Sequence, residues 1–275
     1  MSERTVVITG ASDGIGAAAA GQLHALGFRV VVVGRSAEKS AAVAERLGAD
    51  HLTADFSNLD DVRALADAIN ERYPRIDALL NNAGGVMGKR RHTDDGYELT
   101  LQVNHLAPFL LTNLLLGKLL ASDATVVNTS SVANRVWGKI NINDLGNANR
   151  YTPHKAYGDA KLMNLLFTRE LHRRFHQDGL NAAAFHPGVI ATNFAAGSAS
   201  LLRPLYRNPI AGRILGTPVQ GADTMVWLTV ARPGTDWKPG EYYAGRKRAR
   251  ANRQADDPAL AAELWDHSAA MVGLK

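Results

Sequence analysis

The chain of 275 residues contains no cysteine. Disulfide bonds, thiolate nucleophiles and zinc sites built from thiolates are therefore excluded. Long hydrophobic runs are also absent: the longest candidate, "FLLTNLLLGKLL" (109–120), is interrupted by polar residues and is too short to span a bilayer. The opening "MSERTVVITG" leads almost directly into a candidate strand, which leaves no room for a signal peptide. We expect a cytoplasmic protein without a membrane span.

The sequence also lacks a broad excess of charge. The net charge of +5 comes from 31 basic and 26 acidic residues, and five of the basic ones lie in "GRKRARANR" (245–253), which has no acid. The rest of the chain has equal numbers of both signs. No aromatic interleaving or recognition-helix pattern accompanies the segment, so we interpret it as a solvated or subunit-facing loop and expect no nucleic-acid partner. A homo-oligomer is compatible with this interpretation.

What the chain does contain is a regular alternation of short β-branched runs and longer helical stretches. The predicted strands are 5–9, 29–33, 77–81, 124–130 and 181–185, joined by a weaker one at 51–55; the predicted helices are 14–26, 37–47, 59–72, 95–120 and 154–177. Such alternation predicts right-handed βαβ crossovers. We therefore expect an α/β fold: a Rossmann-type doubly wound parallel sheet in three layers, as one domain over 1–275. Residues 193–217 have no clear period, and we expect a lid over the substrate there.

A glycine-rich loop follows the first predicted strand. "TGASDGIG" places Gly10, Gly14 and Gly16 between a β-branched strand and an Ala-rich helix. Glycine allows a sharp turn and a close approach to a pyrophosphate, and the following helix offers unpaired N–H groups. The loop therefore predicts a dinucleotide site that includes Gly10, Ser12, Asp13, Gly14, Ile15 and Gly16.

The residues after the second strand predict which dinucleotide binds. An acidic residue there would bond the adenosine ribose and repel a 2′-phosphate. The chain instead has Gly34 and then Arg35, whose guanidinium suits bidentate phosphate binding. We expect NADP(H) to be preferred over NAD(H).

Further candidates follow the later strands. Asp55 and Phe56 are placed to meet the adenine ring, and "NNAGG" (81–85), with Asn82, Ala83 and Gly84, is expected to pass the ligand, although this motif can also be a plain turn. Ser130 and Ser131 follow the fifth strand and point to opposite faces. Residues alone do not decide between these two serines.

Two tyrosines each precede a lysine by four positions. Tyr151 and Lys155 flank Pro153, which biases the residue before it away from helix, so these side chains need not share a face. Tyr157 and Lys161 lie within a continuous helical pattern and therefore stack on one side. We predict that Tyr157 and Lys161 are the chemical pair.

Together these motifs resemble the short-chain dehydrogenases/reductases. The resemblance covers nearly the whole chain and rests on "TGASDGIG", "NNAG", Asn104 in "LQVNHLAPFLLTNLLL", the serine after strand five, Tyr157-x-x-x-Lys161 and "HPGVIAT" (186–192). The interval between the serine and Tyr157 is longer than in the most familiar members and is similar to that of the retinol dehydrogenase-like branch. Matching to the family motif favours Ser131 over Ser130.

The resemblance implies a mechanism and completes the set of site residues. A nearby ammonium lowers the pKa of a phenol, so Lys161 would make Tyr157 usable as an acid and a base. The family implies that Lys161 also holds the nicotinamide ribose, that Ser131 hydrogen-bonds the substrate oxygen and that Asn104 positions a water. From "HPGVIAT" it implies cofactor contacts by Pro187, Gly188, Ile190 and Thr192.

The expected function is hydride transfer between NADP(H) and an alcohol or carbonyl compound. Apolar residues in the lid, such as Leu201 and Tyr206, favour an apolar aldehyde, ketone, retinoid-like or steroid-like substrate. The alternative is a non-catalytic regulator that senses NADP(H). No metal is expected, because His172 and His176 lack a third ligand at suitable spacing.

Overall fold

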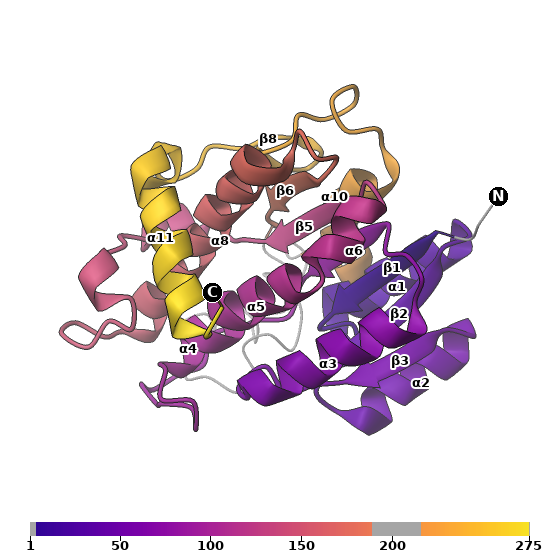
Figure 1. Ribbon diagram of the computed structural model, residues 1–275, viewed down its shortest axis with the longest axis horizontal. Helices are drawn as coiled ribbons and strands as arrows, with labels where there is room; N and C mark the ends of the chain where they lie inside the picture. Colours follow the sequence, from indigo (N-terminus) through magenta and orange to yellow (C-terminus); the bar gives the residue numbers. More distant parts are fainter. Residues whose placement is uncertain (1–3, 189–215, 275) are drawn as a thin grey trace.

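The computed structural model describes residues 4–188 and 216–274, which contain an eight-stranded sheet of order β3-β2-β1-β4-β5-β6-β7-β8 (Figure 1). The strands are β1 (Thr5–Thr9), β2 (Arg29–Gly34), β3 (Asp50–Thr53), β4 (Ala78–Asn81), β5 (Thr125–Thr129), β6 (Asn181–Phe185), β7 (Tyr242–Ala244) and β8 (Lys247–Arg248). Neighbours from β3 to β7 are parallel, and β8 is antiparallel to β7. The predicted doubly wound fold is confirmed.

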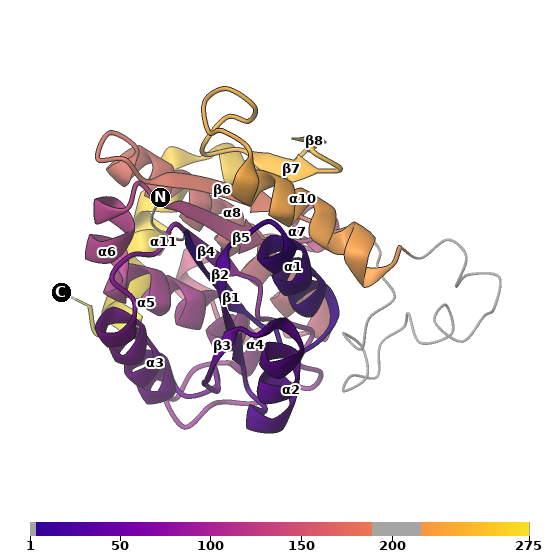
Figure 2. The same ribbon diagram turned by 90° about the vertical axis from the view of Figure 1, so that its right-hand side faces the viewer.

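Helices cover both faces of the sheet (Figure 2). One layer contains α1 (Gly14–Ala25), α2 (Ala37–Leu47) and α10 (Pro218–Val230); the other contains α3 (Leu59–Arg72), α5 (Ala107–Leu114), α8 (Pro153–Phe175) and α11 (Pro258–Met271). Along β1, Val6 and Ile8 pack toward the first layer and Val7 toward the second. Because both faces of β1 are buried, Val6, Val7 and Ile8 are all apolar.

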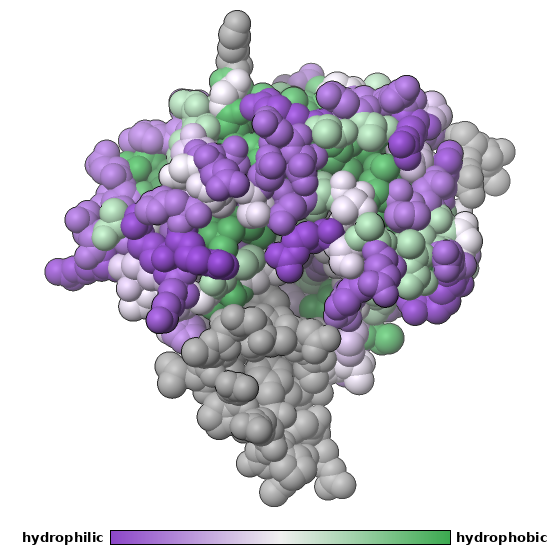
Figure 3. Space-filling view, turned by 90° about the horizontal axis from the view of Figure 1, so that it is seen from below, coloured by the Kyte–Doolittle hydropathy of each residue, from purple (hydrophilic) through white to green (hydrophobic). Residues whose placement is uncertain are grey.

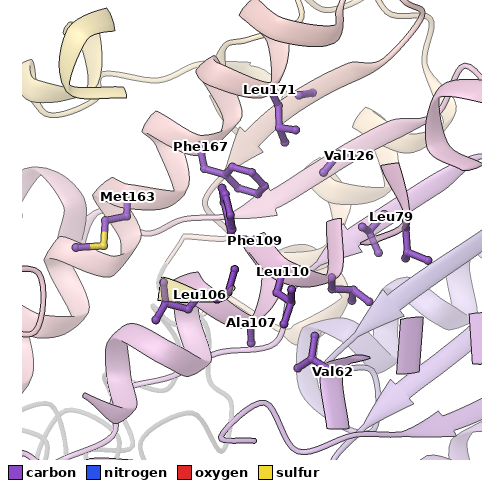
Figure 4. Packing of buried hydrophobic residues seen from close by; sticks show 14 of the residues in the cluster. Val62, Leu79, Leu106, Ala107, Phe109, Leu110, Val126, Met163, Phe167 and Leu171 are labelled. Atoms are coloured by element: carbon purple, nitrogen blue, oxygen red, sulfur yellow. The ribbon is translucent and has the colours of Figure 1, made fainter. Parts of the chain in front are cut away.

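An aromatic group fixes the C-terminal helix α11 over α5 and α8. The ring centres of Phe109 and Phe167 are 5.1 Å apart, and Trp265 of α11 lies 5.0 Å from Phe109 and 5.7 Å from Phe167. Phe109 and Phe167 face each other in the close-up of the core (Figure 4). These distances are within the range of favourable ring pairs. The chain's end is thereby packed against the elements that carry the site.

The predicted helix over 95–120 begins later than expected and is not one continuous α-helix. Gly96 adopts a φ of +86°, which an α-helix does not allow, and the helical region begins only with α4 (Leu99–Leu101). A π-helical turn (Gln102–Leu106) follows before α5, and a break at Leu115 separates α5 from α6 (Leu116–Ala121). Pro108 explains part of this geometry, because it has no N–H to donate to the carbonyl of Asn104 four residues earlier.

The basic segment 245–253 is not simply a loop, so that expectation is also corrected. Gly245 and Arg246 have φ values of +54° and +59° and turn the chain from β7 into β8. Arg246 forms an ion pair with Asp223, and Arg248 with Glu241 at 2.8 Å. Exposed charged side chains on the edge strand β8 discourage pairing with another sheet.

The molecular surface seen from below Figure 1 is mixed, with hydrophobic areas between hydrophilic residues (Figure 3). In the described part of the chain, no helix combines the length and apolarity that a membrane crossing requires.

The predicted lid, 193–217, lies outside the described residues except for its last two positions. Ile190 and Thr192 also lie outside them.

Candidate active site

The glycine-rich loop joins β1 to the first turn of α1, and the predicted residues Gly10, Ser12, Asp13, Gly14, Ile15 and Gly16 all lie there. Gly10 and Gly14 have φ values of +65° and +57°, which favour glycine. A Cβ on Gly16 would lie 2.3 Å from Gly10 O and 2.7 Å from Asn82 Nδ2. The Asn82 amide holds this turn, since Nδ2 donates to Thr9 O at 2.9 Å and to Gly10 O at 3.2 Å. The loop is thus a tight cradle in front of a helix N-terminus.

The end of β2 has no room for an acidic side chain. A Cβ on Gly34 would lie 2.5 Å from Ser40 Oγ and 2.8 Å from Ser12 Oγ. The next residue, Arg35, is exposed, and its guanidinium forms no ion pair with any residue of 4–188 or 216–274. The place where an acid would contact a ribose is therefore filled by serine hydroxyls, with a cation adjacent.

Asp55 and Phe56, at the end of β3, differ in their surroundings. Asp55 Oδ1 accepts hydrogen bonds from the Ser57 N–H at 2.9 Å and the Ser57 hydroxyl at 2.8 Å. Phe56 is 6% exposed and belongs to the core beneath α3. Phe56 is therefore placed mainly for packing, and Asp55 for shaping the turn.

Asn104 holds the loop after β4. Its Nδ2 donates to Gly85 O at 3.0 Å and to Thr100 O at 2.9 Å, and its Oδ1 accepts from the Gly85 N–H at 2.9 Å. Gly84 has a φ of +153°, and a Cβ there would lie 2.4 Å from Asn104 Oδ1 and 3.1 Å from Lys161 Nζ. The "NNAGG" loop, with Asn82, Ala83 and Gly84, therefore packs directly on two predicted catalytic residues.

The two serines after β5 differ in accessibility. Ser130 is 1% exposed, and its hydroxyl donates to Lys161 O at 2.8 Å. Ser131 is partly exposed, and its Oγ accepts from the Ala133 N–H at 3.2 Å at the start of α7 (Ala133–Val136). Only Ser131 keeps a hydroxyl proton available to a substrate oxygen near the surface.

The two tyrosine–lysine pairs also have different environments. Helix α8 begins at Pro153 with Thr152 as its N-cap, so Tyr151 lies outside the helix and donates to Gly88 O at 2.9 Å. Lys155 forms an ion pair with Asp159 at 2.5 Å. Tyr157 and Lys161 are both buried within α8, and Lys161 Nζ lies 5.4 Å from the centre of the Tyr157 ring.

These features agree with comparisons to known proteins. The sequence model of the short chain dehydrogenases matches residues 4–200. The chain belongs to this family. It is 40% identical over 98% of its length, and 93% of the relative, to a Streptomyces sp. (strain C5) protein named "Putative daunorubicin C-13 ketoreductase DnrU". It is 35% identical to human retinol dehydrogenase 14, over 100% of this chain and 88% of that one.

A solved structure of similar fold extends the comparison. The Pseudomonas aeruginosa RhlG/NADP active-site complex has a TM-score of 0.68 and 26% identity, and the match covers 87% of this chain and 93% of that one. As a short-chain dehydrogenase, the protein is an oxidoreductase that acts on alcohol and carbonyl groups.

Burial dominates the electrostatics of this dehydrogenase's lysine. Lys161 is 2% exposed, and burial lowers its pKa from 10.5 to about 7. Its ammonium donates to Thr129 O at 3.1 Å. A lysine that titrates near neutrality can hold or release a proton under physiological conditions.

Sequence reasoning missed Thr9, which shapes the site. Thr9 Oγ1 accepts from the N–H groups of Asn82 and Ala83, both at 3.0 Å, and so joins two strand ends. Pro187 and Gly188 follow β6 as predicted, and the Gly188 N–H donates to His186 Nδ1 at 3.1 Å. A threonine at the end of a buried strand has no sequence signal that separates it from a core residue.

Proposed function

We propose that this short-chain dehydrogenase transfers a hydride between NADP(H) and the alcohol or carbonyl group of an apolar substrate. The main support is the position of the Tyr157–Lys161 pair beside the "NNAGG" loop, which follows β4. Lys161 Nζ lies 5.4 Å from the Tyr157 ring centre and 3.1 Å from where a Cβ of Gly84 would be. A dinucleotide fits this region because Gly10 and Gly14 turn the chain tightly in front of the N-terminus of α1, where backbone N–H groups can bind a pyrophosphate.

Each protein group has a separate task in this mechanism. When bound, NADP(H) supplies the hydride. Tyr157 donates a proton to the developing alkoxide in reduction and accepts one in oxidation, and the Lys161 ammonium stabilises the phenolate. The Ser131 hydroxyl hydrogen-bonds the substrate oxygen. Asn104 contributes its carbonyl as an acceptor for a water that resupplies the proton, because Pro108 cannot donate to it.

Apolar side chains next to Ser131 support an apolar substrate. Val132 and Val136 are 45% and 61% exposed, and Trp137 is 42% exposed and stacks on His154 with ring centres 4.8 Å apart. Three such neighbours near a reactive hydroxyl favour an apolar ligand over a charged one. The names of two relatives refer to daunorubicin and to retinol as substrates, and both of these compounds have large apolar parts.

Turnover of NADPH separates this proposal from an NADP(H)-sensing regulator. Loss of NADPH absorbance should be measured with a panel of apolar aldehydes and ketones, including retinal and polycyclic ketones. We expect turnover with at least one apolar carbonyl compound. NADPH binding at micromolar concentration, without turnover of any member of the panel in either direction, would favour the regulator.

Arg35 provides a test of the cofactor preference. Replacing Arg35 with Ala should weaken NADPH binding about ten- to a hundredfold, because a charged hydrogen bond contributes roughly 1.5–3 kcal/mol. NADH has no 2′-phosphate, so its affinity should change less than about twofold. Isothermal titration of both cofactors against the variant measures the difference.

The control is Arg46→Ala, since Arg46 is an exposed arginine in the last turn of α2, the helix that begins just after Arg35. It should bind both cofactors as the wild type does. Equal losses of NADPH and NADH affinity in Arg35→Ala would show that Arg35 does not bind the 2′-phosphate.

A further inference from the structure

His105 is a buried titratable residue that the mechanism above does not use. It follows Asn104 in the π-helical turn and is 1% exposed. Burial lowers its pKa from 6.5 to about 4, so the imidazole is neutral at pH 7. Its ring lies 6.0 Å from the ring of Phe109 and 6.3 Å from that of Phe167. A neutral imidazole in an apolar core needs partners for both nitrogens.

Both partners are present, and they come from distant parts of the chain. His105 Nδ1 lies 3.4 Å from Asn164 Oδ1 on α8, and Nε2 lies 2.9 Å from Ser268 Oγ on α11. Asn164 Nδ2 lies 3.2 Å from Thr129 O. Asn164 and Ser268 are 4% and 0% exposed. The four groups form one buried line of hydrogen bonds from α11 to the end of β5.

The direction of every bond in this line follows from its last acceptor. A carbonyl only accepts, so the amide of Asn164 must present Nδ2 to Thr129 O and Oδ1 to the histidine. His105 must therefore carry its proton on Nδ1. Nε2 is then unprotonated and accepts from the Ser268 hydroxyl.

The line ends on the carbonyl that also binds Lys161. Thr129 is the last residue of β5, and its oxygen accepts from Lys161 Nζ at 3.1 Å as well as from Asn164. A carbonyl at the end of a strand has no further ladder bond to fix its orientation. The hydrogen bond from Asn164 Nδ2 therefore fixes the Thr129 carbonyl oxygen in the position in which it also accepts from Lys161 Nζ.

We propose that His105, Asn164 and Ser268 are positioning residues. They hold the Thr129 carbonyl in the orientation in which it accepts from Lys161, and the packing of helix α11 holds Ser268 in place. This proposal rests on the proposed function, because it concerns the lysine of that site. It assigns an active-site role to the C-terminal helix, whose Ser268 is 163 residues away from His105 along the chain. Correct docking of α11 is then needed for an ordered Lys161.

The histidine tautomer tests the line without any measurement of activity. In the protein labelled with ¹⁵N-histidine, His105 should show a protonated Nδ1 and an unprotonated Nε2 between about pH 6 and 8. The spectrum of His105→Asn, which lacks these signals, assigns them. A proton on Nε2, or a charged ring at pH 7, would overturn the proposal.

Two amide substitutions then test the positioning role. The amide of His105→Asn can occupy the place of Nδ1 and donate to Asn164, whereas that of His105→Gln reaches the place of Nε2 and leaves Asn164 Oδ1 without a donor. We expect His105→Asn to keep kcat within about threefold. His105→Gln should lose roughly ten- to a hundredfold in kcat, because a slightly misplaced catalytic group has effects of that size.

The KM for the carbonyl substrate and the melting temperature distinguish this role from a structural one. Both variants should melt within a few degrees of each other, and KM should stay within about twofold in both. Equal losses of kcat in the two variants, in proportion to lost stability, would contradict the proposal. A wild-type protein without turnover would instead refute the proposed function, and the tautomer measurement would still decide whether the line exists as described.

Discussion

Replacing Tyr157 with phenylalanine is expected to lower kcat by about 10²–10⁴-fold, the range that a positioned acid–base group contributes. The ring would remain, so the buried packing of Tyr157 within α8 should be preserved. NADPH affinity should stay within about threefold, because we propose that the glycine-rich loop and Lys161 make most of the cofactor contacts. Steady-state kinetics with an apolar ketone and a fluorescence titration of NADPH measure the two quantities.

The matched control is Tyr151→Phe. Tyr151 precedes α8, and its hydroxyl donates to Gly88 O at 2.9 Å. Loss of this bond should cost about 1 kcal/mol of stability and change kcat less than about threefold. If Tyr151→Phe were the inactive variant and Tyr157→Phe retained turnover, our choice between the two pairs would be wrong.

The elements that could be predicted are those whose periodicity has one clear solution. β1 and β6 match the predicted strands, and α2 and α3 match the predicted helices, each with its own cap at Ser36 and Asn58. Strands buried on both faces produce continuous apolar runs, and amphipathic helices produce the 3.6-residue period. In these segments local preference and tertiary packing agree.

The predictions failed where backbone geometry depends on contacts outside the segment. The apolar pattern of 95–120 suggests one helix, but the sequence does not show that Gly96 turns back or that Pro108 permits a π-helical turn at Asn104. β7 and β8 have three and two residues, which are too few to show a period. The pairing of β7 with β6, and of β8 with β7, depends on the rest of the sheet.

The site divides in the same way. Residues in contiguous motifs, such as Tyr157 and Lys161, could be predicted because their spacing alone places them on one helix face. The proposed role of Thr129 could not be predicted, because its backbone carbonyl and not its side chain accepts the hydrogen bonds. Nor could the link from His105 to Ser268, since no local pattern relates residues 163 positions apart.

Lys161→Met should abolish activity and yet stabilise the protein without cofactor. Wild-type Lys161 is 2% exposed, and burial lowers its pKa from 10.5 to about 7, which corresponds to a cost of up to about 5 kcal/mol for holding the charged form in the fold. Methionine has a similar length and no charge. The Thr129 carbonyl would still accept from Asn164 at 3.2 Å, so no buried acceptor would be left unsatisfied. The turnover number should fall at least about a hundredfold, because Tyr157 would lose its cation.

The pH dependence of this gain follows from the two pKa values. Below pH 7 lysine is protonated in both the folded and the unfolded chain, so the wild type bears the full cost of burying the charge and the variant's advantage is greatest. Between pH 7 and 10.5 the folded wild type releases the proton and the unfolded chain keeps it. Wild-type stability therefore rises with pH relative to the variant, and the difference disappears. Urea unfolding at pH 6, 8 and 9.5 measures this trend.

Lys155→Met provides a control with the opposite sign. Lys155 pairs with Asp159, whose side chain is only 3% exposed, so its removal leaves a buried carboxylate without its cation. We expect Lys155→Met to destabilise the protein while changing kcat little, because Lys155 lies outside the proposed site. If Lys161→Met were destabilised to the same degree at pH 6, the ammonium would be stabilising the fold, and the proposed trade of stability for function at Lys161 would be refuted. A stabilised, inactive Lys161→Met beside a destabilised, active Lys155→Met would show that Lys161 is retained for chemistry, since the fold is more stable without its charge.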